Sequence, residues 1–173
     1  KINELPELIG EALRTRPQIQ YLASLYSNRQ SVFFIGRGVD YAAAQEASLK
    51  LKEISYIHSE AYAAGELKHG PISLIEDGTL VIALATDARL FDKMMSNIKE
   101  VKARGAVVLG VATEDKKKIA GQTDMVFYIP KTASFMLPSL SVIPMQLFAY
   151  YVASMKGCDI DKPRNLAKSV TVE

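Results

Sequence analysis

SVFFIG, from Ser31 to Gly36, is the stretch that decides the fold. It is short, continuously apolar and rich in β-branched and aromatic residues, which is typical of a strand buried on both faces of a parallel sheet. Comparable runs occupy Tyr56–Ala61, Leu80–Ala85, Ala106–Val111 and Met125–Ile129. We therefore expect five strands.

Segments with the apolar spacing of helices separate these runs. Helices are predicted at Leu5–Tyr26 with a break near Pro17, at Asp40–Ser55 with Asp40 as N-cap, at Ala88–Arg104, around Lys116–Ala120, and from about Pro138. Strands that alternate with helices form a parallel sheet covered on both faces. The predicted fold class is α/β, a three-layer, doubly wound parallel sheet of the flavodoxin type.

Length and composition fit one domain spanning residues 1–173, and they exclude several classes of protein. The net charge of +2, with one short run at Lys116–Lys118, does not favour nucleic acid. With Cys158 as the single cysteine and only two histidines, neither an intrachain disulfide nor a Cys/His metal cluster is predicted. We expect no metal and no cofactor.

One segment resembles a membrane span, because residues 132–155 carry no charge. Pro138, Pro144 and Gln146 interrupt it, which favours a helix buried against the sheet or a partner subunit. The sequence shows no signal peptide, so a cytoplasmic location is expected. Because the chain starts at Lys1 and runs directly into a helical pattern, we expect a domain cut from a longer protein.

The richest concentration of proton-transfer groups is LKLKEISYIHSEAYAAGELKHGP, from Leu49 to Pro71. On a helical wheel Glu46, Lys50 and Glu53 share one narrow stripe, apart from a polar face formed by Ser48, Lys52 and Ser55. A carboxylate beside a lysine in a half-buried cleft is suited to general acid–base chemistry. The alternative is a pair of ordinary surface ion pairs.

Other candidates lie in loops and in the tail. His69 stands in a Gly/Pro loop that offers it no core, so it is a candidate acid or base, whereas His58 is taken as structural. Lys168 is a candidate carbonyl-binding lysine or an ordinary surface residue. Gly36-Arg37-Gly38 follows the first strand and would allow a ligand to approach closely, or is only a tight turn. No G-x-G-x-x-G motif supports a dinucleotide.

Two motifs, KLKEISYIHSEAYAAGELKHGP and the terminal DKPRNLAKSVTVE, resemble the C-terminal part of the glucosamine-6-phosphate synthase family, also named glutamine–fructose-6-phosphate aminotransferases (isomerising). The resemblance spans about residues 31–173. It implies the second of two sugar-isomerase (SIS) domains, with the first SIS domain and the N-terminal glutaminase domain absent. It also implies a homodimer in which ammonia from glutamine and fructose 6-phosphate become glucosamine 6-phosphate.

The resemblance also implies roles for particular residues. Glu53 matches the base that moves a proton between C1 and C2, and Lys50 matches the lysine that assists it. His69 matches a ring-opening histidine that reaches the site of the neighbouring subunit, and Lys168 matches a lysine that forms a Schiff base with the open-chain ketose. The expected substrate contacts are Ala167, Gly36 and Gly38.

One departure from the family pattern limits what the chain is expected to do alone. The family binds sugar phosphate with a Ser/Thr-rich loop of the first SIS domain, whereas here the first strand is followed by Gly36–Asp40, which has no hydroxyl group. We expect weak or no activity from the isolated chain. A sugar-phosphate-sensing SIS module without catalysis is the alternative, although it would need phosphate-binding hydroxyls and no base. A pure dimerisation unit is a third reading, compatible with the enzyme domain.

Overall fold

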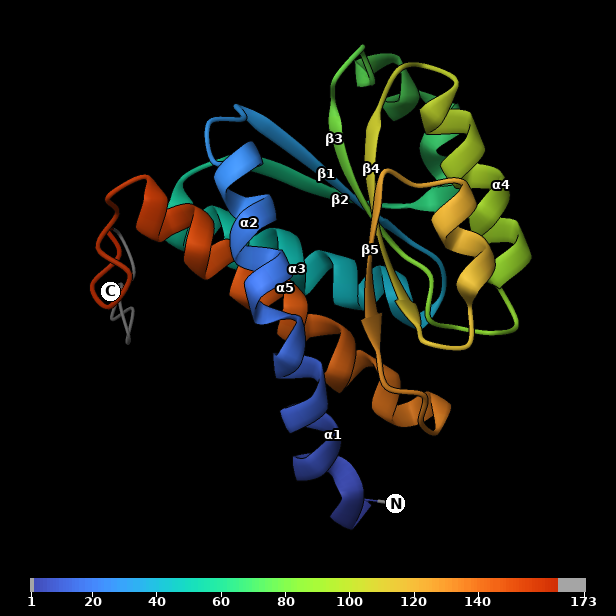
Figure 1. Ribbon diagram of the computed structural model, residues 1–173. Coiled ribbons are helices and arrows are strands. Elements are labelled where there is room, and N and C mark those ends of the chain that lie inside the picture. Colours follow the sequence, from blue (N-terminus) through green and yellow to red (C-terminus); the bar gives the residue numbers. More distant parts are fainter. Residues whose placement is uncertain (1, 165–173) are drawn as a thin grey trace, which may run out of the picture.

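The computed structural model describes residues 2–164, and a five-stranded parallel sheet forms its centre (Figure 1). The strands are β1 (Ser31–Gly36), β2 (His58–Ala63), β3 (Leu80–Leu84), β4 (Val107–Thr113) and β5 (Met125–Ile129). Their spatial order is β2-β1-β3-β4-β5, and every neighbouring pair is parallel. The direction of winding therefore reverses between β1 and β3, which makes that junction the topological switch point.

Helices cover both faces of the sheet, so the predicted three-layer, doubly wound fold is confirmed (Figure 1). One face carries α1 (Leu5–Ala12), α2 (Arg16–Tyr26), α3 (Val39–Ser55) and α5 (Leu137–Met155), whose apolar residues form one core. The other face carries α4 (Phe91–Lys102) and the 3-10 helices η3 (Ala64–His69), η4 (Pro71–Leu74) and η5 (Lys117–Gly121). Short 3-10 turns at Ile2–Glu4, Leu13–Thr15 and Ser134–Met136 complete the described elements.

The strand predictions are confirmed most closely where the apolar run is continuous. β1 and β5 have the expected bounds, whereas the second strand begins at His58, two residues after the expected Tyr56. Tyr56 instead ends α3 in the left-handed region, with a φ of 60°. The expected break near Pro17 is confirmed, because α2 begins at Arg16 with proline in its first turn.

The apolar segment that resembles a membrane span forms the helix α5 and the short turn before it. The segment Ser134–Met155 is long and apolar enough to cross a membrane, but 61% of its apolar 18-residue stretch is buried inside the domain. Leu140, Phe148 and Val152 are almost fully buried in the core shared with α2 and α3. α5 is therefore a core helix, as the interrupting prolines predicted.

Two details of α3 differ from the prediction. Asp40 does not cap the helix, because the N-cap is Gly38 and the Asp40 carboxylate bonds to the turn after β3 instead. Ser48 and Ser55 are buried, although the helical wheel places them on the polar face. The Ser48 hydroxyl donates to the Ser59 hydroxyl of β2 at 3.1 Å, and Ser59 donates to the Ser48 carbonyl at 2.8 Å. Small hydroxyl side chains let α3 approach the edge strand and still satisfy their polar atoms.

Candidate functional site

The predicted stripe on α3 is an ion-paired cluster. Lys50 Nζ donates to Glu53 Oε2 at 2.7 Å and lies 3.7 Å from Glu46 Oε1. The Lys50 side chain is 35% exposed and that of Glu53 is 25% exposed, so the pair is half-buried but open to solvent on one side. The hydrogen bond from Lys50 to Glu53 raises the pKa of Lys50, against the opposing effect of burial. A protonated lysine is thus held against a carboxylate, which is suited to proton transfer.

This cluster stands at the amino-terminal edge of the sheet. α3 starts beside the carboxyl end of β1 and returns along the sheet, so its last turn lies near the beginning of β2. Ligands of doubly wound sheets ordinarily bind at the opposite, carboxyl edge. A site that includes Glu53 therefore cannot be completed by this chain's own carboxyl-edge loops.

His69 lies on the other face of the sheet from Glu53. It ends η3, which packs with α4 through Ala64 and Leu67, and its side chain is 75% exposed. Its Nε2 is 3.9 Å from Glu66 Oε2. Within residues 2–164 no hydrogen bond or ion pair joins His69 to Lys50 or Glu53. Among the described residues, the fold therefore brings Lys50 and Glu53 together and leaves His69 apart from them.

The remaining predicted residues fall in two groups. Ala167 and Lys168 lie outside the described residues. Gly36 and Gly38 follow β1, but their own chain occupies the space beside them. A Cβ on Gly36 would lie 2.7 Å from the Tyr41 nitrogen, and one on Gly38 would lie 2.9 Å from Leu90 Cδ1. Their role as substrate contacts stays a prediction, and the structure gives each an internal reason to be glycine.

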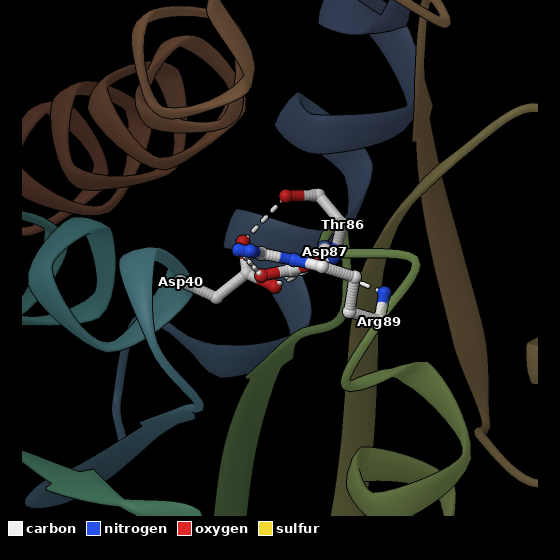
Figure 2. Close-up of polar contacts among 4 residues, drawn as sticks. All are labelled: Asp40, Thr86, Asp87 and Arg89. Atoms are coloured by element: carbon white, nitrogen blue, oxygen red, sulfur yellow. Dashed lines mark hydrogen bonds and ion pairs between the residues drawn. The ribbon is translucent and has the colours of Figure 1, made fainter. Parts of the chain in front are cut away.

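The sequence reading missed a buried polar cluster at the carboxyl edge, where β1 and β3 end side by side (Figure 2). Asp40 accepts the backbone N–H groups of Thr86 at 2.7 Å and Asp87 at 3.0 Å, and the Thr86 hydroxyl also donates to it. Burial raises the pKa of Asp40, although these hydrogen bonds oppose the shift. Adjacency of the ends of parallel strands was the signal that would have found it.

The neighbouring carboxylate, Asp87, accepts three hydrogen bonds from Arg89, one from its backbone N–H at 2.9 Å and two from its side chain. Arg89 Nε and Nη2 donate to the two carboxylate oxygens at 3.2 and 2.9 Å (Figure 2). These bonds lower the pKa of Asp87, whose side chain is only 4% exposed. Beside this pair lies a cavity of about 300 Å³ at the ends of β3, β4 and β5, lined by hydroxyl and charged groups that include Thr113, Asp115, Lys131 and Ser134. No group of three or more His, Cys, Asp or Glu side chains suited to a metal ion occurs among residues 2–164.

The Asp87–Arg89 pair predicts a pH dependence of stability. Because the pKa of Asp87 is lowered by folding, the pair stabilises the fold above the unfolded value of 3.8 and loses this effect as the pH falls through the folded value. Arg89→Met should destabilise the protein near neutral pH, and the difference from wild type should narrow on acidification to about pH 2. Urea unfolding of both proteins across this range checks it. A constant difference would show that Arg89 does not act through the Asp87 charge.

The fold and the sequence place the chain in a known class. Residues 24–156 match the family model described as the SIS domain, so the chain belongs to the SIS domain family. A solved structure described as the C-terminal domain of glucosamine-fructose-6-phosphate aminotransferase from Francisella tularensis superimposes with a TM-score of 0.88 and 37% identity. That alignment covers 92% of this chain and 45% of the other.

Comparison with individual proteins shows which members of that family the chain resembles. The chain is 60% identical over 169 residues to the glutamine–fructose-6-phosphate aminotransferase [isomerizing] of Clostridium tetani, and 48% identical over 173 residues to that of Thermus thermophilus. These alignments cover 98% and 100% of this chain but only 28% and 29% of the relatives. The chain therefore spans under a third of the length of the proteins it matches.

Proposed function

We propose that this chain is the second SIS domain in the isomerase half of a glutamine–fructose-6-phosphate aminotransferase, spanning residues 1–173. The observation that carries the proposal is the half-buried Lys50–Glu53 pair, in a chain 60% identical to one such enzyme. A sensing module that only binds sugar phosphate has no need of a carboxylate base beside a protonated lysine. The enzyme domain is therefore favoured over the regulatory SIS module.

In the proposed reaction, ammonia released from glutamine by a separate domain adds to the ketone of open-chain fructose 6-phosphate. The resulting imine isomerises to the amino-aldose, glucosamine 6-phosphate. Glu53 removes the proton from C1 and returns it at C2, which a carboxylate can do only if it is ionised and reaches both carbons. Lys50, bonded to Glu53 at 2.7 Å, keeps that carboxylate oriented and assists the transfer.

Lys168 and His69 supply the remaining steps of the proposal. His69 opens the sugar ring, and Lys168, with Ala167 beside it, forms a Schiff base with the C2 ketone and releases water. Ammonia then displaces the lysine amine, which leaves the imine that isomerises. Since His69 and Glu53 lie on opposite faces of the sheet, we propose that each site takes its histidine from the neighbouring subunit of a homodimer. The first SIS domain and the glutaminase domain complete the protein, and we place it in the cytoplasm.

Mixing two inactive variants of the full-length protein tests this arrangement. Glu53→Gln and His69→Asn should each be nearly inactive as homodimers. If each site combines Glu53 of one subunit with His69 of the other, a mixed dimer has one intact site and one doubly altered site. Random mixing should then restore about a quarter of the wild-type glucosamine 6-phosphate formation. Subunits unfolded and refolded together provide the mixture, and a mixture of two Glu53→Gln preparations is the control.

Two outcomes would contradict the proposal in different ways. Failure of the wild-type protein to form glucosamine 6-phosphate would remove the proposed function itself. Inactive single variants with no recovery on mixing would place both residues in the site of one subunit, or remove His69 from it.

A further inference from the structure

The crevice at the switch point is where a sheet of this topology ordinarily holds its ligand. With the strand order β2-β1-β3-β4-β5, the switch point lies between the carboxyl ends of β1 and β3. Two turns border it, one leading from β1 into α3 and one leading from β3 into α4. What these turns contain therefore decides whether this domain binds a ligand at its own carboxyl edge.

The donors in this crevice are arranged as in an anion-binding turn. Two successive backbone N–H groups, of Thr86 and Asp87, converge on one carboxylate oxygen of Asp40, and the Thr86 hydroxyl donates to the other (Figure 2). Successive N–H groups together with a hydroxyl are the donors that hold phosphate and carboxylate ligands in proteins. Asp40 is 3% exposed and Thr86 is 1% exposed, so water competes little for these bonds.

The rest of the crevice is closed by the chain itself. Because Gly36 has no side chain, the backbone of Asp40 and Tyr41 packs against the end of β1. Gly38 in the same way leaves room for the side chain of Leu90, which comes from the opposite turn. The Asp87 carboxylate is held by the backbone N–H and the guanidinium of Arg89. The two N–H groups and the hydroxyl that converge at this position are thus all occupied by Asp40.

We propose that Asp40 is the resident anion of a switch-point anion site, and that this crevice is therefore not available to the phosphate of a sugar phosphate. Removal of the Asp40 carboxylate would leave a site of matching shape for a small carboxylate such as formate. The inference concerns anion binding alone and does not require the proposed function. It adds to that function the statement that the substrate phosphate is held outside this crevice.

Chemical rescue of Asp40→Ala in the full-length protein tests the proposal. Alanine keeps Cβ and removes only the carboxylate, whose place formate can fill. The variant should melt about 5 °C or more below wild type, because two buried N–H groups lose their acceptor. Sodium formate should restore at least half of that loss, and sodium chloride at the same concentration should not.

Asp40→Asn is the matched control, because its amide fills the space of the carboxylate. It should also be less stable than wild type, but formate should not raise its melting temperature more than that of wild type. A crystal structure of Asp40→Ala with formate should show the anion bonded to the Thr86 and Asp87 N–H groups. Equal effects of formate on both variants, or an empty site in the crystal, would overturn the proposal.

A second measurement tests whether the crevice is closed to the substrate phosphate, and it does not require Asp40→Ala to fold. In crystals of the wild-type protein with fructose 6-phosphate, no phosphate oxygen should lie within hydrogen-bonding distance of the Thr86 or Asp87 N–H groups. Phosphate at that position, with Asp40 displaced, would refute the inference while leaving the proposed function intact. Loss of the proposed function would instead be seen as absent turnover, with the formate result unchanged.

Discussion

Replacing Glu53 by glutamine in the full-length protein should lower the turnover of fructose 6-phosphate by about 10²–10⁴-fold, the range expected for loss of a general base. Glutamine keeps the size of the side chain and can still accept a bond from Lys50, so the helix and the ion-paired cluster change little. The KM for the sugar phosphate should stay within a few-fold, because the variant loses proton transfer rather than binding. Steady-state assays of glucosamine 6-phosphate formation measure both quantities.

Glu46→Gln is the matched control for that experiment. Glu46 belongs to the same stripe and faces the same lysine, at 3.7 Å rather than 2.7 Å, and it is more exposed than Glu53. If the carboxylates serve only as ion-pair partners, the two variants should behave alike. A large effect of Glu53→Gln with a small effect of Glu46→Gln supports a base, whereas unchanged turnover in Glu53→Gln removes Glu53 from that role.

Gly36→Ala should produce the largest loss of stability among single-methyl additions to this chain. The added Cβ would lie 2.5 Å from the carbonyl carbon of Asp40 and 2.7 Å from the nitrogen of Tyr41, and it would clash with the Asp40 carbonyl oxygen as well. Backbone atoms of a helix start cannot rotate away as a side chain can. We expect a loss of about 3 kcal/mol or more, at the upper end for an overpacked core.

Gly10→Ala provides the contrast, because nothing lies within 4 Å of a Cβ at that position inside α1. Alanine suits a helix interior better than glycine, so this change should stabilise the protein by about 0.5–1 kcal/mol. Urea unfolding of the two variants and wild type gives both values. Similar midpoints for Gly36→Ala and wild type would mean that the turn after β1 relaxes freely, which would also weaken the argument that the crevice is closed.

The fold was predictable because most of its strands are short, continuous runs of apolar residues. β1 and β5 are nearly continuous apolar runs, and such runs have few alternatives to a buried strand. β2 was misplaced by two residues since it is an edge strand with polar His58 and Glu60, which carry no signal of burial. The end of α3 at Ser55 agrees with the prediction, whereas the left-handed conformation of Tyr56 that follows it was not predicted.

The candidate site was predictable only where it is local in sequence. Lys50 and Glu53 are three residues apart on one helix, so helical geometry alone places them in contact. Asp40 and Thr86 are 46 residues apart and meet only through the pairing of β1 with β3. Helical periodicity also failed for Ser48, because a wheel shows polarity and does not show that a hydroxyl can be buried against a neighbouring strand.

The close approach at Gly36 and the carboxylate of Glu53 stand at the two ends of one uninterrupted helix, α3. One inserted residue between them would turn Glu53 by about 100° around the helix axis and move it by about 1.5 Å. We therefore expect that an insertion or deletion inside α3 would remove Glu53 from its proposed position. Insertions and deletions accumulating between residues 36 and 53 would mark a descendant that has given up this chemistry.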